Sequence, residues 1–193
     1  MTRQAFRLVP FPAPTLPAIE ITGNVSFQSN FLSLDYLLSG DIAHILLPPV
    51  SRASSRKDEL WTATCFEFFL AIKAQPGYWE FNMSPSGDWN VYRMDAYRRV
   101  GFRQEARVAQ LPFEIKRESG SYSLHVSVDL APIICSEQQL QIGITAIIQT
   151  NDSIESYWAL THSALQADFH WRESFTLALA GQSHPLEQSA RGG

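Results

Sequence analysis

The chain has 193 residues, of which 45% are hydrophobic and 18% are charged. This composition excludes an intrinsically disordered chain, which combines low hydrophobicity with high charge. The 15 basic and 19 acidic residues give a formal net charge of −4, so the sequence lacks the basic excess that nucleic-acid binding requires. Its length predicts a single domain over residues 1–181, and we expect residues 182–193 to form a flexible tail.

The first ten residues contain two arginines but no apolar segment and no small-residue cleavage site. Elsewhere no apolar run approaches the ~18 residues that a membrane helix needs. We therefore expect a cytoplasmic protein that contacts neither membrane nor nucleic acid. Cys65 and Cys135 form no CxxC pair, so they are predicted to be reduced thiols, with one disulfide as the alternative.

Short apolar runs separated by Gly and Pro are typical of strands. Four prolines between Pro10 and Pro17 predict an extended arm at the start, and residues 51–59 form a polar loop. Strands are predicted over residues 19–27, 31–37, 42–47, 60–72, 78–83, 88–94, 111–117, 122–129, 140–149, 156–159 and 174–179. Helical stretches are expected near 99–109 and 163–168. This pattern indicates an all-β chain, an antiparallel β-sandwich with one or two short helices.

The segment 60–94 carries most of the information about function. A hairpin loop at 73–76 places Glu67 opposite Asn82, and a turn at 84–87 places Asn82 opposite Trp89. Because successive strand residues point to opposite faces, one face of these strands is apolar and is expected to pack inward. It contains Phe66, Phe68, Leu70, Ile72, Trp79, Phe81 and Met83. The other face mixes aromatic rings with polar groups: Trp61, Cys65, Glu67, Phe69, Tyr78, Glu80, Asn82, Trp89 and Arg93.

The mixed face predicts a binding site for a ligand with polar edges and apolar ring faces, such as a small carbohydrate. The predicted ligand-binding residues are Trp61, Glu67, Tyr78, Glu80, Asn82, Trp89, Arg93, Trp158, His162 and His170. Trp61 and Trp89 would stack on the ligand, while the acidic and amide groups would orient it. The structural alternative is that the rings cover a sheet face and that Glu67 pairs with an arginine. A slip of one residue in either hairpin would rearrange the assignment.

A second group of polar and aromatic residues lies at 157–162 and 168–171. We expect this loop to close over one edge of the mixed face. The alternative is structural, with Asp168 tethering the following turn and His170 bonding a backbone carbonyl.

Motifs for the common enzyme classes are missing: GxSxG, a phosphate loop, GxGxxG and HExxH do not occur. Glu67 and Glu80 form a carboxylate pair of the kind that glycosidases use, so a glycoside-processing enzyme stays open as an alternative. No metal site is predicted, because His162, Asp168 and His170 lack a tight ligand spacing. Overall the sequence favours a non-catalytic binding domain.

Three blocks of the sequence resemble the bacterial DOMON-like proteins, which are relatives of the family 9 carbohydrate-binding modules. These blocks are Leu60–Leu70, Tyr78–Trp89, and Tyr157–Leu160 with Asp168–His170 and Phe175. The resemblance implies an immunoglobulin-like or jelly-roll sandwich that binds ligands rather than converting them. Sugar-binding relatives clamp a terminal sugar between tryptophans and bind calcium nearby.

Other relatives bind haem through a Met together with a His or Lys. The resemblance therefore implies, as the alternative function, a b-type haem electron-transfer domain. Its axial ligands would come from Met83, Met94, His162 and His170. The leading hypothesis of carbohydrate binding requires no cofactor.

Overall fold

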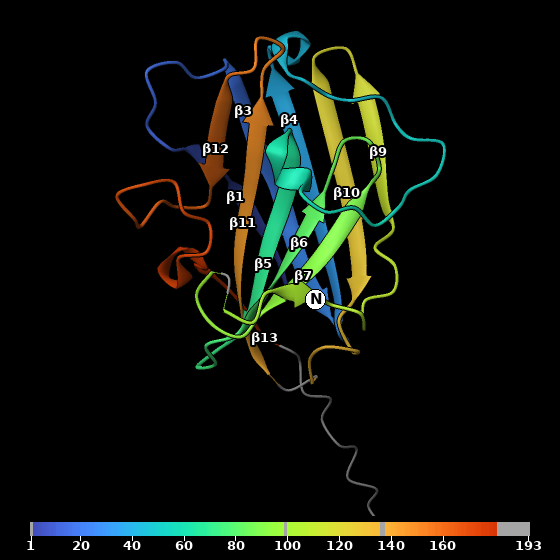
Figure 1. Ribbon diagram of the computed structural model, residues 1–193, viewed down its shortest axis with the longest axis vertical. Coiled ribbons are helices and arrows are strands. Elements are labelled where there is room, and N and C mark those ends of the chain that lie inside the picture. The colour runs from blue at the N-terminus through green and yellow to red at the C-terminus, as the bar shows by residue number, and fades with distance from the viewer. Residues whose placement is uncertain (1, 99, 136–137, 181–193) are drawn as a thin grey trace, which may run out of the picture.

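The computed structural model describes residues 2–98, 100–135 and 138–180, which form two antiparallel sheets packed face to face (Figure 1). The first sheet has the order β1-β3-β4-β10-β9. Its strands are β1 (Thr2–Arg7), β3 (Ile19–Gln28), β4 (Phe31–Gly40), β9 (Phe113–Glu118) and β10 (Ser121–Asp129). The predicted tail at 182–193 lies outside the described residues.

The second sheet has the order β2-β12-β11-β5-β6-β7-β8, and β13 also pairs with β11. Its strands are β2 (Val9–Pro10), β5 (Cys65–Ile72), β6 (Tyr78–Met83), β7 (Trp89–Met94), β8 (Arg103–Gln104), β11 (Gln139–Gln149), β12 (Glu155–Ala159) and β13 (Leu177–Ala180). The predicted antiparallel β-sandwich is therefore confirmed.

Helical structure in the described chain is confined to three 3-10 helices, η1 (Ile42–His44), η2 (Leu60–Thr62) and η3 (Arg172–Ser174). The helices predicted near 99–109 and 163–168 are wrong, because residues 100–109 form turns and β8, and residues 163–168 form bends. Gly101 explains the first error: it has a φ of +68°, and a Cβ there would lie 2.1 Å from Asp95 Oδ2. No helix in the described ranges is long and apolar enough to cross a membrane.

The core between the sheets follows from the alternation of apolar residues. In β4, Leu32, Leu34, Tyr36 and Leu38 are at most 1% exposed and alternate with less buried residues. Strand β5 differs, because all of its residues are buried. Its inward side chains pack in the core between the sheets. Its outward side chains are buried because loops pack over the outer face of the sheet and form a second apolar cluster there.

The register of β5, β6 and β7 decides which side chains face outward. Glu67 pairs with Asn82, as predicted. The second predicted pairing is wrong by one residue: Asn82 pairs with Asn90, and Trp89 pairs with Met83. Trp89 therefore points into the core, where it is 7% exposed, rather than outward.

This slip has its cause in the turn between β6 and β7, which contains five residues, 84–88, instead of the four expected. The Ser84 amide donates to the Asp88 carbonyl at 2.9 Å and closes the turn. The Asp88 carboxylate is buried and accepts hydrogen bonds from Ser55 Oγ at 2.9 Å and Lys57 Nζ at 2.8 Å. Asp88 is thereby held in the turn, and it anchors the loop at 51–59.

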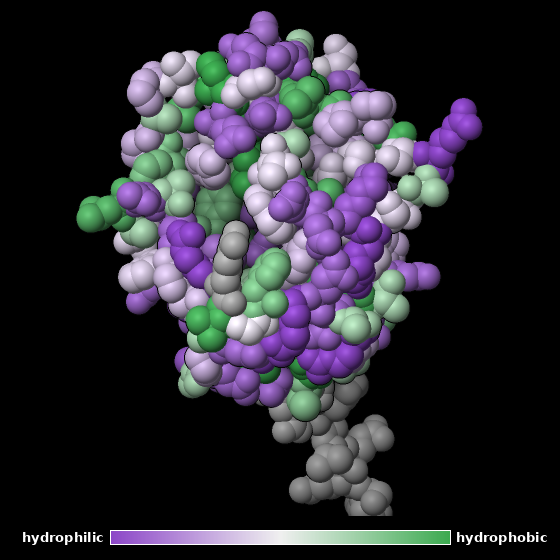
Figure 2. Space-filling view, in the orientation of Figure 1, coloured by the Kyte–Doolittle hydropathy of each residue, from purple (hydrophilic) through white to green (hydrophobic). Residues whose placement is uncertain are grey.

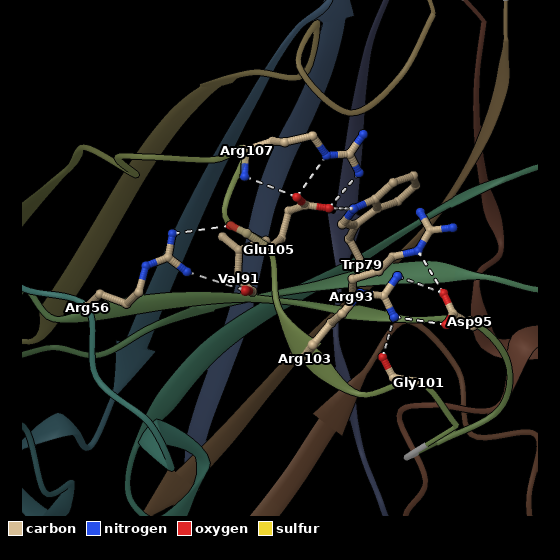
Figure 3. A network of polar contacts seen from close by, with 9 residues as sticks. All are labelled: Arg56, Trp79, Val91, Arg93, Asp95, Gly101, Arg103, Glu105 and Arg107. Carbon is tan, nitrogen blue, oxygen red and sulfur yellow. Dashed lines mark hydrogen bonds and ion pairs between the residues drawn. The ribbon is translucent and has the colours of Figure 1, made fainter.

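A polar network fastens the segment 95–108 to the inward side of the same strands (Figure 3). The Glu105 carboxylate accepts from Trp79 Nε1 at 2.9 Å and from Arg107 Nη2 at 2.7 Å. Hydrogen bonding from Arg107 is the main cause that lowers the pKa of Glu105 to about 2. Arg93, predicted as a site residue, instead stacks its guanidinium 4.0 Å from the centre of the Trp79 ring.

We expect Glu105→Gln to lower the free energy of unfolding at pH 7 by about 1–2 kcal/mol, because it removes a charge-assisted bond whose Arg107 end is half-exposed. The pKa of Glu105 falls on folding from 4.5 to about 2, so the contribution is complete above pH 4.5 and disappears as the pH approaches 2. Urea denaturation followed by tryptophan fluorescence at pH 7 and pH 3 measures both effects. Glu118→Gln, on an exposed residue, is the control, and an equal loss in both variants would contradict the network's role.

Candidate functional site

A cavity of about 1130 Å³ opens on the outward face of the second sheet, over β5, β6 and β7. Figure 2 shows a hollow on this face, with apolar residues in its depth and hydrophilic residues around it. The residues that line it are Asp58, Glu59, Trp61, Glu67, Phe69, Glu80, Tyr92, Arg98, Phe102, Arg103, Gln104, Ile147, Tyr157, Ala167, Asp168, Phe169 and His170. The floor consists of strand residues, namely Glu67, Phe69, Glu80, Tyr92 and Ile147. The walls come from three connecting segments, which contain residues 58–61, residues 98 and 102–104, and residues 167–170.

A polar row crosses the floor along the register of four strands: Thr145, Glu67, Asn82 and Asn90. Thr145 Oγ1 donates to Glu67 Oε2 at 3.3 Å, and Asn82 Nδ2 donates to Glu80 Oε1 at 2.7 Å. The remaining acceptors, Glu67 Oε1 and Asn82 Oδ1, are buried and have no hydrogen-bond partner among the described residues. Native proteins pair nearly all such atoms, so both require a donor from outside the described chain, and of the two residues Glu67 lines the cavity.

The neighbouring row supplies Glu80 and the aromatic part of the site. Glu80 lies between Phe69 and Tyr92 in the register. Tyr92 carries an aromatic wall, because Trp61 packs against it with ring centres 5.6 Å apart and Phe102 stacks on it at 4.7 Å. The wall joins side chains from the 51–62 loop, β7 and the 95–108 segment.

Asp58 ties the same wall together at the mouth of the cavity. Its Oδ1 atom accepts from Tyr92 Oη at 2.7 Å, Gln104 Nε2 at 2.9 Å and Asn90 Nδ2 at 3.0 Å. The hydrogen bond from Tyr92 is the main cause that lowers the pKa of Asp58. This side chain is therefore an ionised, exposed acceptor beside the rings.

The floor carboxyl groups behave in the opposite way. Glu67 and Glu80 are 2% and 5% exposed. Burial raises the pKa of Glu67, and the charge of Glu80 raises it further. Burial also raises the pKa of Glu80, to about 7. Near neutral pH the floor therefore holds at least one proton on a pair of acids.

His170 faces Glu80 from the loop between β12 and β13, with Nε2 3.9 Å from Glu80 Oε2. Burial lowers the pKa of His170 to about 4, so the ring is neutral at pH 7. Tyr78 Oη lies 2.9 Å from His170 Nδ1 and already accepts from the Arg98 amide. In the tautomer in which the Tyr78 hydroxyl donates to Nδ1, the ring proton lies on Nε2, toward Glu80.

The structure brings four of the predicted site residues together at the cavity, Trp61, Glu67, Glu80 and His170. Tyr78 and Asn82 are fully buried in the same floor. Trp89 and Arg93 lie on the inward side of the sheet, because the five-residue turn at 84–88 shifts the register of β7 by one residue from the predicted one. The expectation that the 168–171 loop covers one edge of the outward face is confirmed, since Asp168 and His170 line the cavity.

Two predicted residues from the 157–162 block lie elsewhere. Trp158 points into the core, where it is 4% exposed and donates from Nε1 to Ser156 Oγ at 2.9 Å. Its neighbour Tyr157 lines the cavity instead, because successive residues of β12 point to opposite faces of the sheet. His162 Nε2 lies 3.0 Å from the Val9 carbonyl and does not line the cavity.

Of the four residues considered as haem ligands, Met83 lies on the opposite side of the sheet from His170. Met83 lies in the core between the sheets. Met94 is buried on the outward side in the cluster that contains Tyr78 and Phe175. Neither methionine lines the cavity, whereas His170 does. Within the described residues the geometry gives no support to an axial Met–His pair.

Sequence reasoning missed Asp58, Asn90, Tyr92, Arg98 and Tyr157. Asn90, Tyr92 and Tyr157 follow from alternation once the register is correct. Asp58 and Arg98 lie on irregular segments, where no periodic pattern marks orientation. Arg98 pairs with Asp168 at 3.1 Å and closes one side of the cavity.

We expect Glu80→Gln to raise the free energy of unfolding at pH 8 by about 2–3 kcal/mol, because it removes a buried charge while keeping an acceptor for Asn82. The pKa of Glu80 rises on folding from 4.5 to about 7, so the folded state gains stability below that range and loses it as the pH rises through 7. The difference between variant and parent should therefore be small at pH 5 and reach its full size at pH 8. Urea titrations across this range test it, and parallel curves would show that Glu80 ionises normally.

No protein-family model matches the chain, and no curated protein sequence matches it. Solved structures do resemble it. A protein of Bacteroides uniformis described as a "putative carbohydrate-binding protein" gives a TM-score of 0.65 at 12% identity, over 90% of this chain and 83% of that one. A family 9 carbohydrate-binding module of Caldicellulosiruptor kristjanssonii in complex with glucose gives 0.50 at 12% identity, over the same shares. At these identities the likeness shows a shared fold, that of the family 9 modules, while a likeness to DOMON proteins stays a prediction.

Proposed function

We propose that this chain is a non-catalytic carbohydrate-binding domain and that the cavity on the outward face of the second sheet is its sugar site. The observation that carries the proposal is the combination, in one cavity, of an aromatic wall with buried acceptors that have no partner. A sugar presents apolar ring faces and polar edges, so it matches both parts at once.

The aromatic wall suits the apolar face of a sugar ring. Trp61 meets Tyr92 edge to face, with an angle of 66° between their rings, and Phe102 stacks on the same tyrosine at 21°. Trp61 is partly exposed and lines the cavity. It is therefore the ring that we assign to stacking, without the second tryptophan that the sequence predicted.

The polar floor suits the hydroxyl groups of the same ligand. Glu67 lines the cavity, and its Oε1 atom requires a hydrogen-bond donor, which a sugar hydroxyl supplies. At the mouth, Asp58 offers a second set of acceptors beside Gln104. A ring that stacks on Trp61 would meet acceptors both beneath its edge and beside it.

The positions of the two buried acids favour binding over hydrolysis. A glycosidase needs two carboxyl groups on either side of the bond that breaks. Glu67 and Glu80 instead project from adjacent strands of a single floor, so both meet the same edge of a ligand. The solved neighbours support the same reading, since one is described as a carbohydrate-binding protein and the other holds glucose.

We expect Trp61→Ala to weaken sugar binding about tenfold or more, because it removes the stacking ring. Isothermal titration against a panel of mono- and disaccharides measures the parent protein and the variant side by side. Phe31→Ala is the matched control, since Phe31 is an exposed aromatic residue on the other sheet. Binding that survives unchanged in Trp61→Ala would remove this cavity as the site, and a parent protein that binds no sugar would refute the function.

A further inference from the structure

The charges around the cavity are unevenly distributed. Its lining contains five acidic side chains and two arginines. Both arginines are already committed, because Arg98 pairs with Asp168 at 3.1 Å and Arg103 pairs with Asp95 at 2.8 Å. The two acids of the floor are thus left without a lysine or arginine partner among the described residues.

These floor acids, Glu67 and Glu80, are the most buried of the set. They lie on adjacent strands, diagonal to each other in the register, and both point into the same floor. The nearest ionisable cation is the His170 ring, at 3.9 Å from Glu80, which is neutral at pH 7. Two buried carboxylates repel each other and lose hydration, so the floor must take up a proton or a cation.

The unpaired atoms of the floor accept hydrogen bonds once the acid pair is ionised. Glu67 Oε1 and Asn82 Oδ1 have no donor in reach within the described chain. Asn82 Nδ2 directs one N–H to Glu80 Oε1 at 2.7 Å, and within the described chain it makes no hydrogen bond to Glu67. An ammonium group fits this arrangement, since it brings three N–H donors together with a positive charge.

The surroundings favour an organic ammonium over a metal ion. Aromatic rings line the same cavity, Trp61, Phe69 and Tyr92 among them. Such rings attract cations through their faces but are poor ligands for Ca²⁺ or Mg²⁺, which require six or more oxygen ligands. Among the described residues no group of three His, Cys, Asp or Glu side chains converges in metal-binding geometry.

We propose that the sugar bound in this cavity is an amino sugar, whose protonated amine lies against the carboxyl groups of Glu80 and Glu67. The inference rests on the proposed function and specifies its ligand class. The hydroxyl groups of the same ring would meet Asp58 and Gln104 at the mouth, contacts that a linear polyamine does not need.

Binding of an amine should depend on pH, because it depends on which groups around Glu80 are ionised. The groups that face Glu80 are Cys65 and Glu67 of β5, Tyr78 of β6, Tyr92 of β7 and His170 of the loop. Burial raises the pKa of the thiol and of both hydroxyls, and it lowers the pKa of His170 to about 4. Between pH 5 and pH 8 the titrating unit in the floor is therefore the Glu67–Glu80 pair. An amine should bind better as this pair ionises.

Isothermal titration with glucosamine, N-acetylglucosamine and glucose tests the proposal. We expect glucosamine to bind at pH 7 about tenfold or more tightly than either neutral sugar, because it alone brings a charge to the floor. At pH 5 this preference should shrink several-fold. Glu80→Gln should reduce the preference at pH 7, whereas Glu118→Gln, an exposed acid on β9, should keep it.

The outcomes separate the two proposals. Glucose binding as tightly as glucosamine at pH 7 would overturn the amino-sugar inference and leave carbohydrate binding intact. A parent protein that binds none of the three sugars, nor any other sugar of the wider panel, would overturn both. Spermidine serves as a probe of charge alone: if it bound more tightly than glucosamine, the ligand would be a polyamine and the inference would fail. A urea titration of Glu80→Gln confirms that the variant is folded.

Discussion

The turn between β6 and β7, closed by the hydrogen bond from the Ser84 amide to the Asp88 carbonyl, fixes the outward face of the second sheet. It sets the pairing of Met83 with Trp89, and through it the direction of every side chain in β7. Tyr92 thereby lines the cavity, and Asn90 lies on the same face of the sheet. The Asp88 carboxylate extends the same control to the loop at 51–59, because Lys57 and Ser55 bind to it. One buried aspartate thus holds both the turn before β7 and the loop that precedes Trp61.

The burial of polar groups on that face has a physical consequence. Buried acids with raised pKa values lower the free energy of unfolding at neutral pH. The same acids are the groups that we expect to bind the ligand, so the floor of the cavity gains binding with a loss of stability. Networks elsewhere offset this, notably the Glu105 carboxylate between Trp79 and Arg107. That network also holds the segment that bears Phe102. This part of the cavity wall is therefore attached to the sandwich by side-chain hydrogen bonds, although it has little regular structure.

The sandwich and half of the site could be predicted from the sequence, because both depend on local periodicity. The pairing of Glu67 with Asn82 follows from alternation and a short hairpin loop. The position of Trp89 does not, since it depends on contacts of Asp88 with residues more than thirty positions earlier in the chain. The polar and aromatic block at 157–162 likewise does not show that Trp158 points into the core. Asp58 could not be assigned at all, because its orientation is set by three side chains brought together only in the folded state.

The two faces of the second sheet therefore carry different constraints. Packing of the inward face requires only apolar side chains of suitable volume, and many different sequences provide them. This explains how a chain can share its fold with solved structures at 12% identity. The outward face is demanding, because each buried acceptor needs a donor of matching position and charge. Ligand identity should accordingly be read from Glu67, Glu80 and Asn82 and from the loops around them, rather than from the fold.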